Sequence, residues 1–240
     1  MPVAIVTGAS KGLGRALAAG LAGRGWDLVL DARTAEVLEE SAEAARARGA
    51  RVVAVAGDVR DAGHRAELVA AARGLGGLDL LVSNASALGA APLVRLDALP
   101  LDGLRAAFET NAVAALGLVQ EGLPLLRESA AGTVLVVSSD AAVEAYGTWG
   151  GYGASKAALD RLAAVLAVEE PGLRVWAVDP GDMATDLYAA AVPDDPDPRP
   201  APETVVPGFL ALVERRPASG RYAAVELVPA SGGPAEGVAR

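Results

Sequence analysis

Short apolar runs alternate with longer helical stretches through most of this 240-residue chain. Six runs are nearly continuous in apolar residues, as expected for strands buried on both faces of a parallel sheet. They are residues 3–7, 28–30, 51–56, 78–83, 133–139 and 173–178. Between them, residues 34–48, 61–73 and 102–127 carry apolar residues at helical spacing. The alternation predicts a single α/β domain with a Rossmann-like, doubly wound parallel sheet of about seven strands and right-handed crossovers.

The chain changes character after residue 190. Residues 192–202, VPDDPDPRPAP, contain five prolines and three aspartates without periodicity, which predicts an irregular segment. This segment is either a disordered excursion or part of a lid, residues 182–202, over a site. A helix at 203–215 and a strand near 222–228 complete the expected domain, residues 1–228. Residues 229–240 are expected to form a flexible tail.

Composition excludes several classes of function. The chain has no cysteine and one histidine, His64, which argues against a metal site. Its net charge of -9 argues against nucleic-acid or anionic-membrane partners. No apolar run approaches the roughly 18 residues of a membrane-spanning helix. The first residues also lack the features of a secretory signal, so a soluble, cytoplasmic protein is expected.

The glycine-rich segment TGASKGLGR, residues 7–15, follows the first expected strand and opens the first expected helix. Gly8, Gly12 and Gly14 allow a sharp turn and a close approach of the backbone to a ligand. The free amides at the start of the helix attract a phosphate group. Such turns also join strands to helices where no ligand binds, but the strand before and the helix after favour a pyrophosphate site.

The order of short motifs along the chain resembles the short-chain dehydrogenase/reductase family over about three quarters of its length. After the glycine loop come GDV (57–59), NAS (84–86), Asn111, VVSSDAA (136–142), YGASK (152–156) and DPGDMATDL (179–187). The resemblance implies an oxidoreductase that interconverts a carbonyl compound and a secondary alcohol with a nicotinamide nucleotide.

The resemblance also implies the cofactor-binding residues. They are Gly8, Ser10, Lys11, Gly12, Leu13, Gly14, Arg33, Asp58, Val59, Asn84, Ala85, Tyr152, Lys156, Pro180, Gly181, Met183 and Thr185. The acidic position of NAD-selecting members aligns with Ala32, and Arg33 follows it. Arg33 and Lys11 therefore predict NADP(H) rather than NAD(H). The carboxylate of Asp31 could instead turn toward the ribose. Ser86 stands where the family commonly has glycine.

The catalytic residues implied are Asn111, Ser139, Tyr152 and Lys156. Ketone reduction needs a proton donor, and a nearby cation is expected to lower the pKa of the tyrosine from about 10. Tyr152 and Lys156 are four residues apart, so on a helix they share one face. Ser138 and Ser139 are expected to point to opposite faces of their strand. The resemblance implies that Asn111 keeps the lysine connected to water.

A mainly apolar substrate pocket is expected from Leu88, Val143, Tyr146, Trp149, Leu187 and Tyr188. The expected partners are a small carbonyl compound or alcohol and further copies of the chain, as a homodimer or homotetramer. Two alternatives stay open: a catalytically silent NADP-binding regulator or scaffold, and another enzyme on a Rossmann-like sheet, such as a methyltransferase.

Overall fold

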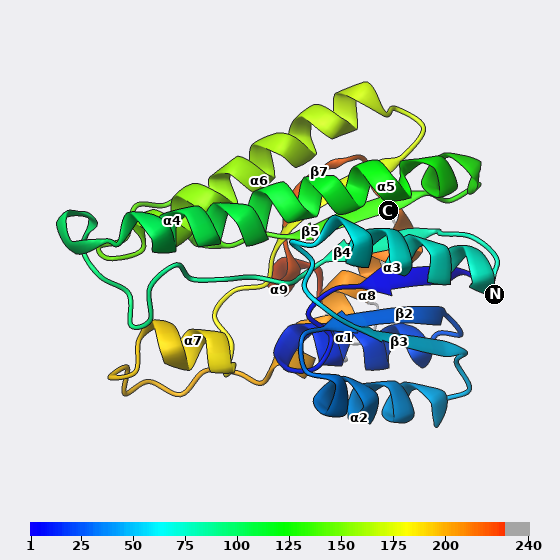
Figure 1. Cartoon of the computed structure of the whole chain (residues 1–240), viewed down its shortest axis with the longest axis horizontal. Coiled ribbons are helices and arrows are strands. Elements are labelled where there is room, and N and C mark those ends of the chain that lie inside the picture. The colour runs from blue at the N-terminus through cyan, green and yellow to red at the C-terminus, as the bar shows by residue number, and fades with distance from the viewer. Residues whose placement is uncertain (229–240) are drawn as a thin grey trace, which may run out of the picture.

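The centre of the molecule is a parallel sheet of seven strands, seen in a computed structural model that describes residues 1–228. The strand order is β3-β2-β1-β4-β5-β6-β7 (Figure 1). The strands are β1 (Val3–Val6), β2 (Asp27–Ala32), β3 (Val52–Ala56), β4 (Leu80–Ser83), β5 (Thr133–Val137), β6 (Arg174–Asp179) and β7 (Gly220–Ala223). Each of the six apolar runs overlaps a strand. The predicted doubly wound, single-domain fold is therefore confirmed.

Helices cover both faces of the sheet, because strands this apolar must be buried on each side. On one face lie α1 (Gly12–Ala22), α2 (Ala35–Arg46) and α8 (Val206–Arg215). On the other lie α3 (Ala62–Leu75), α5 (Ala114–Glu128) and α6 (Gly150–Glu169), while α4 (Leu101–Phe108) continues the line of α5 beyond the sheet (Figure 1). Two apolar cores result, one on each side of the sheet.

The strand order reverses direction between β1 and β4, which lie side by side although two βα units separate them in sequence. At such a switch point, the connections after the two strands leave toward opposite faces and open a crevice at the carboxyl edge of the sheet. The glycine loop follows β1 and the NAS segment follows β4. Both motifs are therefore brought to one crevice.

The helix predicted over 102–127 is interrupted in the middle. A π turn, Glu109–Val113, joins α4 to α5, and Asn111 lies within it with 1% of its surface exposed. An extra residue per turn re-aims nearby side chains, and such turns are frequent at functional sites.

The end of the described chain departs from the expected strand at 222–228. The strand β7 stops at Ala223 and a helical turn, α9 (Ala224–Leu227), follows. The reason is a close contact with α8: a Cβ on Gly208 would lie 2.1 Å from the carbonyl oxygen of Ala224. The chain leaves the sheet to bring Ala224, which is fully buried, against this helix.

The other segments near the crevice are short. A helix α7 (Asp186–Ala191) follows β6, and the proline-rich residues after it form no helix or strand until a 3-10 turn at Pro202–Thr204, as expected. The tail predicted at 229–240 lies outside the described residues. No helix within residues 1–228 has the length and apolar character needed to cross a bilayer.

Candidate active site

Two adjoining clefts cross the carboxyl edge of the sheet. The smaller, of about 280 Å³, runs from the glycine loop to Tyr152 and Lys156. The larger, of about 730 Å³, runs from the same loop to the ends of β2 and β3. Both are lined by Gly8, Lys11, Ala85, Ser86, Asp186 and Leu187. Together they form one elongated site, as an extended dinucleotide would need.

The glycine loop is built for an anion. Gly8 and Gly12 have φ values of +65° and +50°, in the left-handed region that favours glycine. A Cβ on Gly14 would lie 2.2 Å from the carbonyl oxygen of Gly8, so this position has no room for a side chain. No side chain caps α1, whose N-cap residue is Lys11. The first amides of α1 therefore face the cleft and fit a pyrophosphate group.

Asn84 and Thr7 hold the glycine loop in place. The side-chain amide of Asn84 donates to the carbonyl oxygens of Thr7 and Gly8, at 2.9 and 3.2 Å. The hydroxyl of Thr7 accepts from the backbone amides of Asn84 and Ala85, each at 3.0 Å. The side chain of Asn84 therefore ties β4 to the loop after β1, while Ala85 lines both clefts.

The far end of the larger cleft contains predicted and unpredicted residues. Ser10, Arg33, Asp58 and Val59 all line it. Arg33 is exposed and forms no ion pair within residues 1–228. Sequence analysis missed Arg60, whose guanidinium lies 2.6 Å from Asp58 and holds the pKa of that carboxyl at about 2.

Two charged side chains at this end have partners that the sequence did not reveal. Lys11 donates to Asp186 at the start of α7, at 2.8 Å, and both side chains are exposed. Asp31 does not face the cleft openly: its carboxylate is buried and lies 2.6 Å from Nε2 of His64. The alternative in which Asp31 turns to the ribose is therefore not the arrangement observed.

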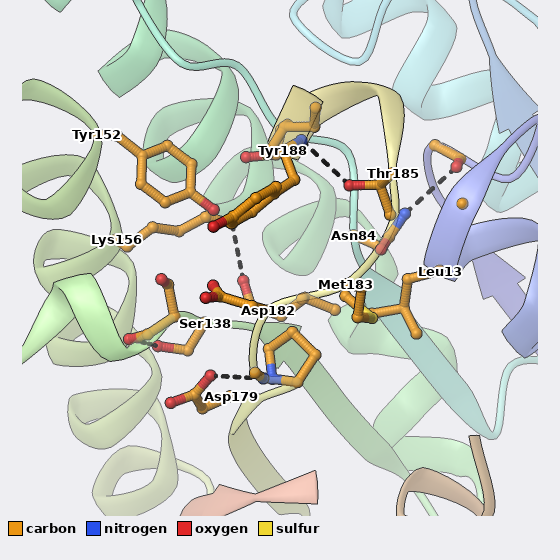
Figure 2. A pocket seen from close by; sticks show the side chains of 18 of the residues that line it. Leu13, Asn84, Ser138, Tyr152, Lys156, Asp179, Asp182, Met183, Thr185 and Tyr188 are labelled. Carbon is orange, nitrogen blue, oxygen red and sulfur yellow. Dashed lines mark hydrogen bonds between the residues drawn. The ribbon is translucent and has the colours of Figure 1, made fainter. Parts of the chain in front are cut away.

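Tyr152 and Lys156 lie side by side in the smaller cleft, on the first turns of α6 (Figure 2). Their exposed fractions are 6% and 1%. The ammonium of Lys156 lies 5.6 Å from the centroid of the tyrosine ring and donates to the carbonyl oxygen of Val137 at 2.8 Å. The structure thus brings the predicted acid and its cation together.

The direction of the tyrosine pKa was predicted wrongly for the protein alone. Burial raises the pKa of Tyr152 to about 12, and hydrogen bonding with Ser86 opposes this rise. The charge of Asp140 adds to it. Burial also lowers the pKa of Lys156 to about 8. Desolvation is therefore the largest influence on the pKa values of both groups.

Ser138 and Ser139 both contribute to the lining of the smaller cleft. The backbone stays extended past the end of β5, with φ -163° and ψ 155° at Ser139, so the expected alternation of the two side chains stays a prediction. The hydroxyl of Ser139 donates to Asp140 at 3.0 Å. Hydrogen bonding between Ser139 and Tyr152 also opposes the rise in the pKa of the tyrosine. Ser139 is thus the serine placed beside the tyrosine.

The Asn111 side chain is fully engaged by protein groups. Its carbonyl oxygen accepts from the hydroxyl of Ser86 at 3.2 Å and the amide of Ala87 at 2.7 Å. Its amide donates to the carbonyl oxygen of Ala87 at 2.9 Å and to the hydroxyl of Ser155 at 2.8 Å. Asn111 therefore fastens the segment after β4 to α6, and its link to Lys156 through water stays a prediction.

The segment after β6 forms the floor of the smaller cleft. Pro180, Gly181, Met183 and Thr185 all line it, and Figure 2 shows the side chains of Met183 and Thr185 there. Thr185 is the N-cap of α7, and its hydroxyl oxygen accepts from the amide of Tyr188 at 3.1 Å. This bond leaves the hydroxyl proton free to donate to a ligand.

The predicted substrate pocket is partly wrong. Trp149, Leu187 and Tyr188 line the smaller cleft, and Leu88 lines the larger. Val143 and Tyr146 line neither, because the turn that carries them lies at the surface with 61% and 46% of their areas exposed. The smaller cleft also contains four aspartates, so it is more acidic than expected: Asp140, Asp179, Asp182 and Asp186.

Comparisons with known proteins agree with this site. The family model of the short chain dehydrogenases matches residues 2–196. Sepiapterin reductase of Rattus norvegicus is 35% identical over 208 residues, covering 82% of this chain and 79% of the relative. An uncharacterized oxidoreductase of Saccharomyces cerevisiae is 35% identical over 188 residues, covering 77% of this chain and 72% of the relative.

Solved structures of dehydrogenases are similar to this chain over nearly its whole length. An alcohol dehydrogenase from Thermococcus sibiricus, complexed with 5-hydroxy-NADP, aligns with a TM-score of 0.84 and 26% identity over 93% of this chain and 95% of that one. A putative short chain dehydrogenase from Escherichia coli, complexed with NADPH, aligns with a TM-score of 0.85 and 28% identity over 93% of this chain and 96% of that one.

The fold and the site define an oxidoreductase whose clefts are consistent with a nicotinamide cofactor. The chain belongs to the short-chain dehydrogenase/reductase family.

Proposed function

We propose that this protein is an NADP(H)-dependent oxidoreductase that interconverts a carbonyl compound and a secondary alcohol. The observation that carries the proposal is a pair of buried side chains in the smaller cleft. Tyr152 and Lys156 lie together beside Ser139, and the glycine loop lines the same cleft. A purely binding protein would gain nothing from burying an ammonium next to a phenol, since both groups lose hydration.

Each side chain has a separate task in this proposal. The bound nicotinamide nucleotide supplies or accepts the hydride. The hydroxyl of Tyr152 gives a proton to the carbonyl oxygen, or takes one from the alcohol in the reverse direction. Ser139 holds that oxygen by a second hydrogen bond. The ammonium of Lys156, 5.6 Å from the ring centroid, favours the phenolate that remains after the proton leaves.

The preference for NADP(H) rests on charge at the larger cleft. The exposed Arg33 supplies a planar fork that suits a 2′-phosphate. The carboxylates of Asp31 and Asp58 are occupied by His64 and Arg60, which removes the competing ribose acceptors. The two solved relatives from Thermococcus sibiricus and Escherichia coli are complexed with 5-hydroxy-NADP and NADPH.

Residues 182–202 are proposed as a lid over the substrate. Leu187 and Tyr188 line the smaller cleft, and Arg199 reaches back to pair with Asp195 and to donate to the Tyr188 hydroxyl at 2.9 Å. These contacts support a folded lid in place of a disordered excursion. The cytoplasmic location and the homodimer or homotetramer stay predictions.

The test is a panel of ketones and aldehydes with NADPH, followed by the loss of absorbance of the reduced nicotinamide. Tyr152→Phe should lower the turnover number by a factor on the order of 100 or more, because the proton donor is lost. Its dissociation constant for NADPH should stay within about threefold of the wild-type value, because the ring and Lys156 remain. Retained turnover in this variant would refute the role of the phenol.

A further inference from the structure

A buried pair of side chains, Asp31 and His64, lies under the larger cleft and has no part in the proton transfer. Asp31 is next to last in β2, and His64 lies in the first turn of α3. Oδ1 of Asp31 and Nε2 of His64 are 2.6 Å apart, and their side chains are 2% and 7% exposed. With Asp31 ionised, the imidazole donates to it in a short, charge-assisted hydrogen bond.

The position of the imidazole is fixed from two sides. The backbone amide of His64 donates to the side chain of Asp61, which caps α3, at 2.9 Å. On the other side, a Cβ on Gly57 would lie 2.2 Å from Nδ1 of His64, so the ring packs directly on the glycine backbone. The ring is therefore held between the Asp31 carboxylate and the backbone of Gly57, directly after β3.

The Asp31 carboxylate, in contrast, has a second orientation open to it, toward the larger cleft. Asp31 belongs to the wall of the larger cleft, together with Arg33 and Thr34. Its other oxygen, Oδ2, accepts only a long bond of 3.4 Å from the amide of Gly8. Burial raises the pKa of Asp31, and the hydrogen bond with His64 opposes this rise. Without the imidazole, an ionised Asp31 would be better hydrated by turning toward the open cleft.

A second carboxylate at the larger cleft, that of Asp58, also has a side-chain partner. Asp58 is held by Arg60 through two nitrogens, with Nη2 at 2.6 Å and Nε at 3.0 Å from its oxygens. Both acidic side chains near the ribose end therefore have a partner of their own. Arg33 is left to face a ligand.

We propose that His64 is a positioning residue for cofactor selection: it holds the Asp31 carboxylate against α3, away from the nucleotide ribose, and so lets the cleft accept a 2′-phosphate. The proposal rests on the NADP(H) preference proposed above. A freed Asp31 would repel the 2′-phosphate of NADPH and accept from the ribose hydroxyls of NADH. The ratio of the two affinities is therefore the quantity that His64 controls.

A matched pair of variants separates this role from a structural one. His64→Gln keeps an amide donor near the position of Nε2, whereas His64→Asn places its amide near Nδ1 and cannot reach Asp31. Dissociation constants for NADPH and NADH are measured on the purified full chain without substrate, from the fluorescence of the reduced nicotinamide. His64→Asn should lower the preference for NADPH about tenfold, the size expected for one charge facing another across an open cleft. His64→Gln should stay within about threefold of the wild-type preference.

The double variant Asp31→Asn/His64→Asn provides the decisive control. Because the freed charge is absent, its preference for NADPH should return to the wild-type value. A loss of both affinities by the same factor in His64→Asn, or an equal fall in His64→Gln, would overturn the role of His64. If His64→Asn does not fold, the same comparison is made with His64→Leu, alone and with Asp31→Asn. A wild-type protein that binds NADH more tightly than NADPH would refute the proposed function itself, which is a different outcome.

Discussion

Replacing Lys156 by methionine should make the protein alone more stable while it abolishes turnover. The side chain is 1% exposed, and burial lowers the pKa of the ammonium from 10.5 to about 8. That fall corresponds to about 3 kcal/mol by which the folded protein disfavours the charged lysine relative to the unfolded chain. Methionine has a similar length and carries no charge, so the variant avoids this cost.

Two favourable contacts of Lys156 are lost in the same change. Its hydrogen bond to the carbonyl oxygen of Val137, at 2.8 Å, contributes about 1 kcal/mol. Its contact with the ring of Tyr152, 5.6 Å from the centroid, contributes about 0.5 kcal/mol. The net stabilisation expected at pH 7 is therefore about 1 to 2 kcal/mol, or a rise in Tm of about 3 to 6 °C for a chain of this size.

The assay is urea unfolding of wild type and Lys156→Met without nucleotide, at several pH values. Below pH 8 the lysine is charged in both states and the full cost is present. Between pH 8 and 10.5 the unfolded chain keeps a proton that the folded protein has released, so wild-type stability rises with pH. The advantage of the variant should shrink accordingly.

The matched control is Lys11→Met, which removes an exposed lysine paired with Asp186. Its effect should stay within about 0.5 kcal/mol. A Lys156→Met protein that is less stable than wild type at pH 7, with a difference that does not change up to pH 10, would refute the reasoning.

Three further predictions follow from single contacts. Asp140→Asn should lower the pKa of Tyr152, because the charge of Asp140 raises it. The pH midpoint of alcohol oxidation should therefore move down by up to about one unit, and an unchanged or higher midpoint would contradict this. Gly14→Ala should abolish nucleotide binding in a fluorescence titration, because its Cβ would lie 2.2 Å from the carbonyl oxygen of Gly8, whereas Gly74→Ala, with open space around it, should bind normally. Arg33→Ala should weaken NADPH binding about tenfold or more and leave NADH binding nearly unchanged, and an equal loss for both would argue against a 2′-phosphate contact.

Much of the fold was predictable because buried parallel strands have a simple signature. Runs such as residues 133–139 are apolar on both faces, and only a sheet covered by helices on each side can bury them. The strand at the end of the described chain was predicted less well. Ala224 and its neighbours suit a strand or a helix equally, and the choice depends on the space left by Gly208 in a helix that packs against them.

The site was predictable where chemistry depends on local spacing. Tyr152 and Lys156 meet because they are four residues apart on one helix, whatever the rest of the molecule does. Partners distant in sequence were not predictable: Lys11 pairs with Asp186, 175 residues away, and Asp31 with His64. The pKa of Tyr152 was predicted with the wrong sign because its degree of burial cannot be read from a motif.

The π turn at Glu109–Val113 holds one residue more than an α-helical turn would. Removing one residue there would let the turn close with ordinary α-helical hydrogen bonds, and α4 and α5 would keep nearly the same faces toward the molecule. The residues inside the turn would still change direction, because each residue of an α-helix advances the side-chain direction by about 100°. A single deletion there would thus displace the amide that fastens Ala87 to Ser155 while leaving the packing of both helices largely intact.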